Sequence, residues 1–338
     1  MTTPLLEVKD LVKTFKVSTG WMPWMDKKLH AVNEVSFSIG QKETVGIAGE
    51  SGCGKSTLAW CLMGLYPITS GTVKFQGKEL LQPKNPDLKT LRQNVQMVFQ
   101  DPYDSLNPRR TIGELVGDPL QIQTNLSKKE IRERVLKLLD DVGLPASSYN
   151  KFPGELSGGQ RQRVGIARAL IVNPELIIAD EAVASLDVSI QAQVLNLFAD
   201  LQEERNLSYL FITHDLSVLR HMADRIIIMY LGEIVEIGTN EEIYHRPAHP
   251  YTQALLASAT DASSDVQIGV GVNIEGEIPS PIDRPVGCPF APRCPIAQDI
   301  CVTQKPELRT LENGTQAACH FPAVPAAEGS AIPGAVAV

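Results

Sequence analysis

The sequence contains no long hydrophobic run. No stretch of the 338 residues approaches the roughly 20 consecutive apolar residues that a membrane-spanning helix needs. The first residues, Met1 to Lys9, also lack the basic segment followed by a long apolar segment that is typical of a secretory signal peptide. We therefore expect the chain neither to cross a membrane nor to be exported through one.

Two other missing features narrow the function classes. The net charge is -8, with acids and bases interspersed, so the bulk charge shows no basic excess that would indicate nucleic-acid binding. No heptad pattern of apolar residues is sustained, which argues against a long coiled coil. The chain is nevertheless long enough for more than one domain and a substantial core.

The first motif that is present is a glycine-rich loop. Residues Gly49 to Ser56 fit the pattern G-x-x-x-x-G-K-[ST] at every fixed position. The apolar segment 43–48 predicts a buried strand before the loop, and the segment 57–63 predicts a helix after it. Glycines let backbone N–H groups surround phosphates, and the helix N-terminus adds a favourable dipole. The residues expected to contact a nucleotide are Gly49, Ser51, Gly52, Gly54, Lys55, Ser56 and Thr57.

A second strand, residues 176–181, ends in two carboxylates. Four apolar residues followed by Asp180 and Glu181 predict a central parallel strand with its acids at the carboxyl edge, where ligands bind in open α/β sheets. Taken alone, such a pair is more often a helix cap and a first-turn acid. Together with the loop, the pattern indicates that Lys55 reaches the β- and γ-phosphates and that Ser56 and Asp180 hold Mg²⁺. Glu181 is then placed to orient the attacking water.

Another glycine motif lies about a hundred residues after the first. Ser157, Gly158, Gly159 and Gln160 open the strongly helical run 161–171. This pattern forms a second anion site at a helix start, or only a helix cap with flexible glycines. One chain has no obvious use for two phosphate sites. The two become one composite site if a partner chain faces this one head to tail.

With these motifs in this order, residues 5–250 resemble the nucleotide-binding subunit of an ABC transporter. The resemblance implies that Gln100 senses Mg²⁺ and faces the membrane partner, that Asp187 crosses the dimer interface, and that His214 contacts the γ-phosphate. It also implies that Phe15 stacks on adenine, although Phe15 could equally be a core residue of an N-terminal strand. With Glu181, the residues Gln100 and His214 form the expected catalytic set.

The implied fold is α/β: a P-loop NTPase (RecA-like) core with an inserted helical subdomain at about residues 100–170. Ser127 and Glu130 form a capping box that predicts a helix from residue 128. We expect a nucleotide-binding domain at 1–250, a small cysteine-containing C-terminal extension at 251–321 and a disordered tail at 322–338. The segment 17–30, which contains two tryptophans, predicts a loop that either packs on its own sheet or contacts a neighbouring chain.

The C-terminal part resembles the extension of the oligopeptide and dipeptide importer ATPases. The resemblance rests on residues 249–256, the proline-rich stretch 278–285 and the cysteine-containing stretch 287–295, and it extends to residues 100–108 and 185–191. It implies an ATP-hydrolysing subunit that powers uptake of peptides or a similar oligomeric solute.

Four of the six cysteines, Cys288, Cys294, Cys301 and Cys319, lie within 32 residues of each other. In a chain that stays in a reducing compartment, such a cluster favours metal over disulfides. The spacings match neither the C-x₂-C pairs of zinc ribbons nor the common ferredoxin patterns. Because some members of the resembled subfamily carry a [4Fe-4S] cluster on such cysteines, the resemblance implies that cluster. Zinc and unligated thiols stay open, and His320, beside Cys319, is an alternative ligand.

The resemblance also implies partners and a location. The expected partners are a second ATPase subunit, in a heterodimer more than a homodimer, two membrane-spanning permease subunits and an extracytoplasmic solute-binding protein, with no nucleic acid. The chain is then a peripheral subunit on the cytoplasmic face of the cell membrane, with ATP and Mg²⁺ as cofactors. Oligosaccharides and nickel complexes remain alternative cargoes, and a soluble ABC-type mechanoenzyme remains an alternative function.

Overall fold

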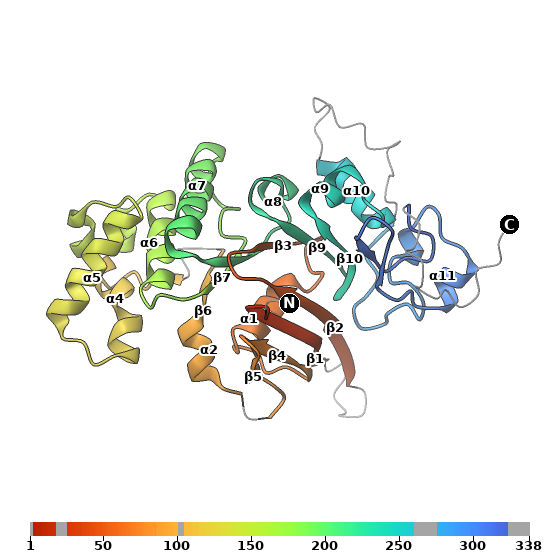
Figure 1. The fold of residues 1–338 in the computed structure, drawn as a ribbon, viewed down its shortest axis with the longest axis horizontal. Helices are drawn as coiled ribbons and strands as arrows, with labels where there is room; N and C mark the ends of the chain where they lie inside the picture. The colour runs from red at the N-terminus through yellow and green to blue at the C-terminus, as the bar shows by residue number, and fades with distance from the viewer. Residues whose placement is uncertain (1–2, 18–25, 85, 101–104, 260–275, 324–338) are drawn as a thin grey trace.

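The computed structural model describes residues 3–17, 26–84, 86–100, 105–259 and 276–323. The aromatic residues at 21–25 and the expected tail beyond residue 323 lie outside these ranges. Figure 1 shows a central sheet with helices above it, a second sheet below it, a helical group at one end and the C-terminal residues at the other.

The N-terminal sheet is antiparallel and has the order β2-β1-β4-β5. Its strands are β1 (Leu6–Val17), β2 (Lys27–Ile39), β4 (Ser70–Phe75) and β5 (Lys78–Leu81). Strands β1 and β2 stay paired as far as Val17 opposite Lys27. The expectation of a loop over the whole of segment 17–30 is therefore wrong at both ends, because cross-strand hydrogen bonding continues the hairpin beyond its apolar residues.

The main sheet has the order β11-β12-β10-β9-β3-β8-β7-β6. Its central strands are parallel: β6 (Val95–Val98), β7 (Leu176–Asp180), β8 (Ser208–Ile212), β3 (Thr44–Ala48) and β9 (Arg225–Tyr230). Strands β3, β7 and β8 are buried along their whole length. Parallel strands place their carboxyl ends at one edge, so the segments that follow β3, β6, β7 and β8 meet there.

Helices cover both faces of the main sheet (Figure 1). Helix α1 (Lys55–Leu62) lies between the main sheet and the antiparallel sheet, and its apolar residues belong to the core that both sheets share. On the other face lie α7 (Val188–Arg205), α8 (Leu216–Met222) and α9 (Asn240–His245). Helix α2 (Leu88–Asn94) precedes β6. This α/β arrangement confirms the predicted P-loop fold.

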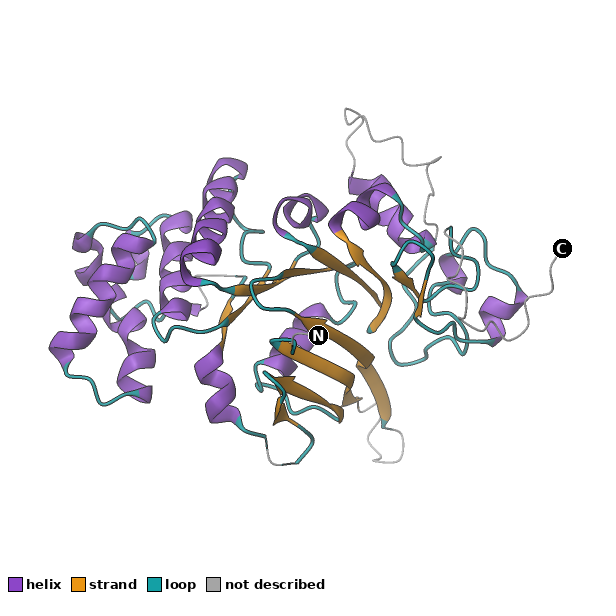
Figure 2. Cartoon of the chain, in the orientation of Figure 1, coloured by secondary structure: helices purple, strands orange, loops and turns teal. Residues whose placement is uncertain are grey.

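The helical group contains α4 (Ile112–Gln123), α5 (Lys128–Asp141) and α6 (Gly158–Leu170), with short 3₁₀ turns η2 (Ala146–Asn150) and η3 (Pro153–Glu155). Figure 2 shows it as a group of helices at the β6 end of the main sheet. The predicted capping box starts α5: the Ser127 hydroxyl accepts from the backbone N–H of Glu130, whose carboxylate accepts from the backbone N–H of Ser127. Helix α5 thus begins at residue 128, as its capping box predicts.

The C-terminal residues continue the main sheet. After β10 (Glu233–Thr239) come α10 (Pro250–Ala259), the 3₁₀ turn η4 (Ala291–Arg293), α11 (Asp299–Thr303), β11 (Arg309–Thr310) and β12 (Gln316–Ala317). Strand β12 pairs with β10, and β11 pairs with β12. The extension therefore shares the sheet of the nucleotide-binding core.

Candidate nucleotide site

The glycine-rich loop joins β3 to α1 and requires glycine for two reasons. Gly49 and Gly54 have φ angles of 155° and 107°, which residues with a side chain rarely adopt. A Cβ atom on Gly49 would lie 2.2 Å from the backbone oxygen of Met229, and one on Gly54 would lie 2.1 Å from that of Ala31. The loop is thus packed tightly against β9 and β2, and these contacts constrain its backbone shape.

Lys55 carries its charge inside this loop. Its side chain is buried, and Nζ donates to the backbone oxygens of Gly49 at 2.7 Å and Glu50 at 3.0 Å. The ammonium therefore lies at the centre of the loop, where it can attract the phosphates that the loop backbone would bind.

The predicted magnesium ligands lie side by side. The Ser56 hydroxyl donates to Oδ1 of Asp180 at 3.1 Å, which joins the start of α1 to the end of β7. Burial raises the pKa of Asp180 to about 6, although the Ser56 hydrogen bond opposes the shift. A bound cation would reverse this effect of burial, and a hydroxyl and a carboxylate are oxygen ligands that suit Mg²⁺.

Glu181 is the meeting point of the predicted catalytic residues. Its Oε2 accepts from Gln100 Nε2 at 2.7 Å, and its Oε1 lies 3.1 Å from Nδ1 of His214. The three residues follow β7, β6 and β8 respectively, so the sheet edge brings them together. Glu181 itself has a φ of 47°, which turns the chain sharply after Asp180. The carboxylate is thus held in a fixed orientation, as a group that positions a water must be.

The second glycine motif begins α6. The Ser157 hydroxyl accepts from the backbone N–H of Gln160, whose side-chain oxygen accepts from the backbone N–H of Ser157. Ser157 and Gly158 are exposed, and so is Asp187, the cap of α7. Helix α6 lies in the helical group, whereas α1 lies between the two sheets, so the two glycine motifs belong to separate parts of the chain (Figure 1).

Phe15 is half-buried on β1 rather than part of the core. Its ring makes an edge contact with Tyr66, with centroids 5.3 Å apart, and the Lys13 ammonium lies 4.7 Å from its centroid. The partly exposed ring is compatible with stacking on a base, which stays a prediction.

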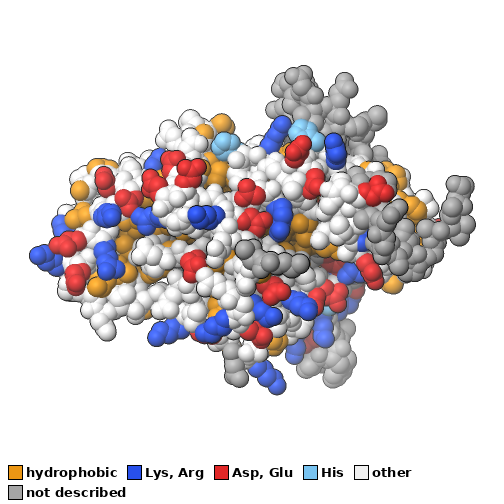
Figure 3. Space-filling model, viewed as in Figure 1, with side chains coloured by type: hydrophobic (Ala, Val, Ile, Leu, Met, Phe, Trp, Pro, Cys, Tyr) orange, Lys and Arg blue, Asp and Glu red, His pale blue; other side chains and the backbone are white. Residues whose placement is uncertain are grey.

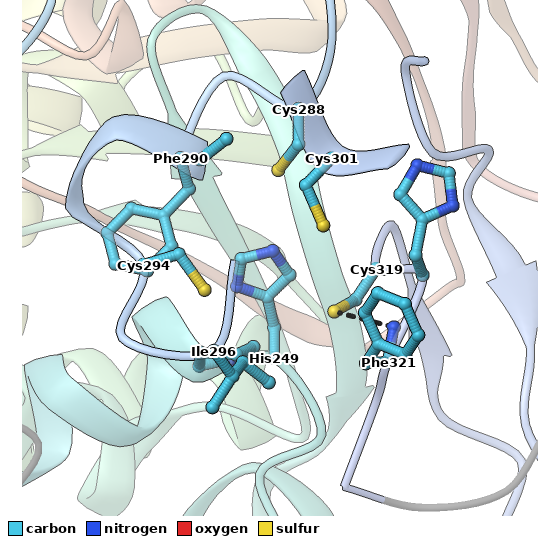
Figure 4. A pocket seen from close by; sticks show the side chains of 11 residues that line it. His249, Cys288, Phe290, Cys294, Ile296, Cys301, Cys319 and Phe321 are labelled. Atoms are coloured by element: carbon cyan, nitrogen blue, oxygen red, sulfur yellow. Dashed lines mark hydrogen bonds between the residues drawn. The ribbon is translucent and has the colours of Figure 1, made fainter. Parts of the chain in front are cut away.

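The four clustered cysteines line one small pocket (Figure 4) with a volume of about 10 Å³, room for about one water molecule. All six cysteines are free thiols. Burial raises the pKa of Cys288 to about 11 and that of Cys319 to about 12. Within the described ranges, no group of three or more His, Cys, Asp or Glu side chains is arranged to hold a metal ion.

Two contacts at the phosphate loop were not predicted. Tyr251 and Arg293, both from the C-terminal extension, contact Glu50, the second residue of the loop. The stretches that contain them stand out in the sequence, but only the three-dimensional structure brings them to residue 50.

Comparison with known proteins agrees with this geometry. A family model described as "ABC transporter" matches residues 32–184, and one described as "Oligopeptide/dipeptide transporter, C-terminal region" matches residues 235–301. The dimeric post-hydrolysis structure of the ATP-binding cassette MJ0796, bound to ADP and Pi, is similar with a TM-score of 0.61 and 32% identity over 70% of this chain and 98% of that chain.

Similarity to full-length proteins covers nearly all of the sequence. The chain is 49% identical to the oligopeptide transport ATP-binding protein OppF of Escherichia coli, over 90% of this chain and 92% of that protein. It is 45% identical to the probable peptide ABC transporter ATP-binding protein y4tS of Sinorhizobium fredii, over 100% of this chain and 95% of that protein. The chain therefore belongs to the ATP-binding subunits of the ABC transporter family, among those with the oligopeptide/dipeptide transporter C-terminal region.

Proposed function

We propose that the chain hydrolyses ATP to power an importer of peptides or a similar oligomeric solute through separate membrane subunits. The observation that carries the chemistry is the convergence of Gln100 and His214 on Glu181, next to the Ser56–Asp180 pair. Import of peptides is supported by the C-terminal region that the chain shares with oligopeptide transport proteins. The same similarity favours an importer over a soluble mechanoenzyme.

The residues divide the reaction between them. The loop backbone and Lys55 bind the phosphates, while Ser56, Asp180 and Gln100 would hold Mg²⁺, which would supply positive charge to neutralise the phosphates. Glu181 accepts a hydrogen bond from the attacking water and aligns it with the γ-phosphorus. His214 donates to the γ-phosphate, and Phe15 stacks on adenine.

We further propose that each site is completed by a second ATPase subunit. Ser157, Gly158, Gly159, Gln160 and Asp187 would then contact ATP held by the partner's phosphate loop. The exposure of Ser157, Gly158 and Asp187 supports this arrangement, and so does the dimeric state of the similar cassette MJ0796. A non-identical partner is our preferred form of the dimer.

The membrane passage belongs to other subunits in this proposal. No helix among the described residues is long and apolar enough to cross a membrane. We place the chain on the cytoplasmic face of the cell membrane, bound to two permease subunits and coupled to an extracytoplasmic solute-binding protein.

The test is transport by the complete complex in proteoliposomes. Peptide-loaded binding protein should stimulate ATP hydrolysis by the wild-type complex and lead to peptide uptake. A complex with Glu181→Gln should show neither stimulated hydrolysis nor uptake. Stimulation by an oligosaccharide or a nickel complex in place of peptides would replace the proposed cargo. Turnover that does not respond to the binding protein or the permeases would contradict the importer.

We also propose that the four clustered cysteines hold a [4Fe-4S] cluster, with zinc as the alternative metal. The proposal is supported by the convergence of four thiols from separate segments on one pocket. A metal would require the thiols to deprotonate and the narrow pocket to open, because the present arrangement of the described side chains is not that of a metal site.

A further inference from the structure

The C-terminal extension holds the first half of the phosphate loop. Glu50 donates its backbone N–H to the Tyr251 hydroxyl at 2.8 Å. The Glu50 carboxylate accepts two hydrogen bonds from Arg293, from Nη1 to Oε2 at 2.8 Å and from Nη2 to Oε1 at 3.1 Å. Both partners lie far along the chain from the loop, in α10 and η4. The loop is therefore shaped in part by residues outside the nucleotide-binding core.

Arg293 is held in place by aromatic rings. Only 8% of its side chain is exposed, against 23% for that of Glu50. The Arg293 guanidinium carbon lies 5.9 Å from the centroid of the Tyr230 ring, and Tyr230 contacts both Tyr251 and Phe290 edge-on. A bidentate guanidinium fixed in this way combines charge with orientation, which a flexible lysine would not supply.

The charge of Glu50 makes this contact important for the ligand. Glu50 is an acid within a loop that binds a polyanion, and its own backbone oxygen accepts from Lys55. An unpaired carboxylate here would repel the phosphates and attract the Lys55 ammonium away from them. Arg293 neutralises that carboxylate through a direct ion pair.

We propose that Arg293 is a positioning residue for ATP binding. Its guanidinium neutralises Glu50, and with Tyr251 it fixes the loop backbone, so the C-terminal extension sets the affinity of the phosphate loop for ATP. The inference rests on the proposed function only in taking this loop as an ATP site.

The test compares two arginines of the extension. Arg293→Met leaves Glu50 unpaired, whereas Arg284→Met removes a partly buried pair with Glu233 and removes neither the Tyr251 nor the Arg293 contact with Glu50. Binding of MgATP to the full chain is measured by calorimetry. Arg293→Met should raise the Kd roughly five- to twentyfold, the effect of one unpaired charge near an anion at a partly exposed site. In the assembled complex it should raise KM and leave kcat within about twofold of the wild-type value, because Glu181 and its partners are untouched.

A double variant separates the effect of the Glu50 charge from the effect of losing the Arg293 contact. Adding Glu50→Gln to Arg293→Met should recover most of the lost affinity, because no charge is left to neutralise, although the tether stays broken. Glu50→Gln alone should bind ATP at least as tightly as wild type. This variant tests the proposal even if Arg293→Met does not fold.

Four results would overturn the inference: unchanged affinity in Arg293→Met, no recovery in the double variant, weaker ATP binding in Glu50→Gln alone, or an equal loss in Arg284→Met. Lys55→Ala is the control for the proposed function. If Lys55→Ala binds ATP as wild type does, the loop is not the ATP site, whatever Arg293 does.

Discussion

At the residue scale, the proposed ATP hydrolysis depends on a few side chains at one edge of a parallel sheet. Glu181, Gln100 and His214 were expected together from the family resemblance, and their hydrogen bonds place them together. The contacts of Glu50 with the C-terminal extension could not be predicted from the sequence, because Glu50 occupies a variable position of the motif. Its partner Arg293 is separated from it by most of the chain, and no local pattern links the two.

Glu181→Gln should keep ATP binding and slow turnover, because the amide cannot accept the proton of the attacking water. Loss of a positioned general base lowers kcat by roughly 10²- to 10⁴-fold. Single-turnover hydrolysis and ATP binding are measured on the same assembled complex. Turnover within about threefold of wild type would remove Glu181 from the catalytic set.

At the element scale, the strands and helices around the motifs were predictable because their patterns are local. The buried strand before the loop and the strand that ends at Asp180 begin and end within a few residues of the expected positions, and the capped helix α5 begins at the expected residue. The pairing of β12 with β10 was not predictable, because a two-residue strand has no periodicity and its partner lies far away in sequence. The extension of β1 and β2 into segment 17–30 was not predicted for another reason: cross-strand hydrogen bonding lengthens this hairpin beyond its apolar residues.

The packing of α6 on α7 gives a prediction about two adjacent glycines. A Cβ atom on Gly159 would lie 2.4 Å from Cγ2 of Ile190, whereas one on Gly158 would lie 3.7 Å from its nearest neighbour, in Leu186. Gly159→Ala should therefore lower the free energy of unfolding by about 1–3 kcal/mol, the cost of overpacking next to a stiff β-branched side chain. Gly158→Ala is the matched control and should cause no loss. Equal midpoints for both variants in urea unfolding would contradict the close approach of the two helices.

The cysteine pocket gives a prediction about the extension. Anaerobically purified protein should be brown and carry about four iron atoms per chain. Cys294→Ser should lower the yield of the complex more than it alters ATP cleavage in the complexes that survive, because the thiols line a pocket apart from Glu181.

A colourless preparation with one zinc per chain would replace the cluster with a zinc site. Absence of metal, with all four thiols alkylated in the native protein, would leave these residues without a metal-binding role.

At the scale of the whole molecule, we propose that the chain carries one half of each of two different sites. The phosphate loop and Glu181 lie at the edge of the main sheet, and the exposed start of α6 lies in the helical group. Acidic and basic side chains are interspersed over the face shown in Figure 3, as the composition suggests, and no single-sign surface dominates it. We propose that a second ATPase subunit completes each site.

The most direct test is Ser157→Arg in a complex whose other ATPase subunit is unchanged. Vanadate trapping of a photoreactive ATP analogue labels whichever chain's phosphate loop holds the trapped nucleotide. The bulky arginine side chain would block the anion site at the start of α6. We therefore expect labelling to be lost at the partner's phosphate loop, although Lys55, Asp180 and Glu181 of this chain are unchanged. Loss of labelling only at this chain's own loop would contradict the head-to-tail composite site.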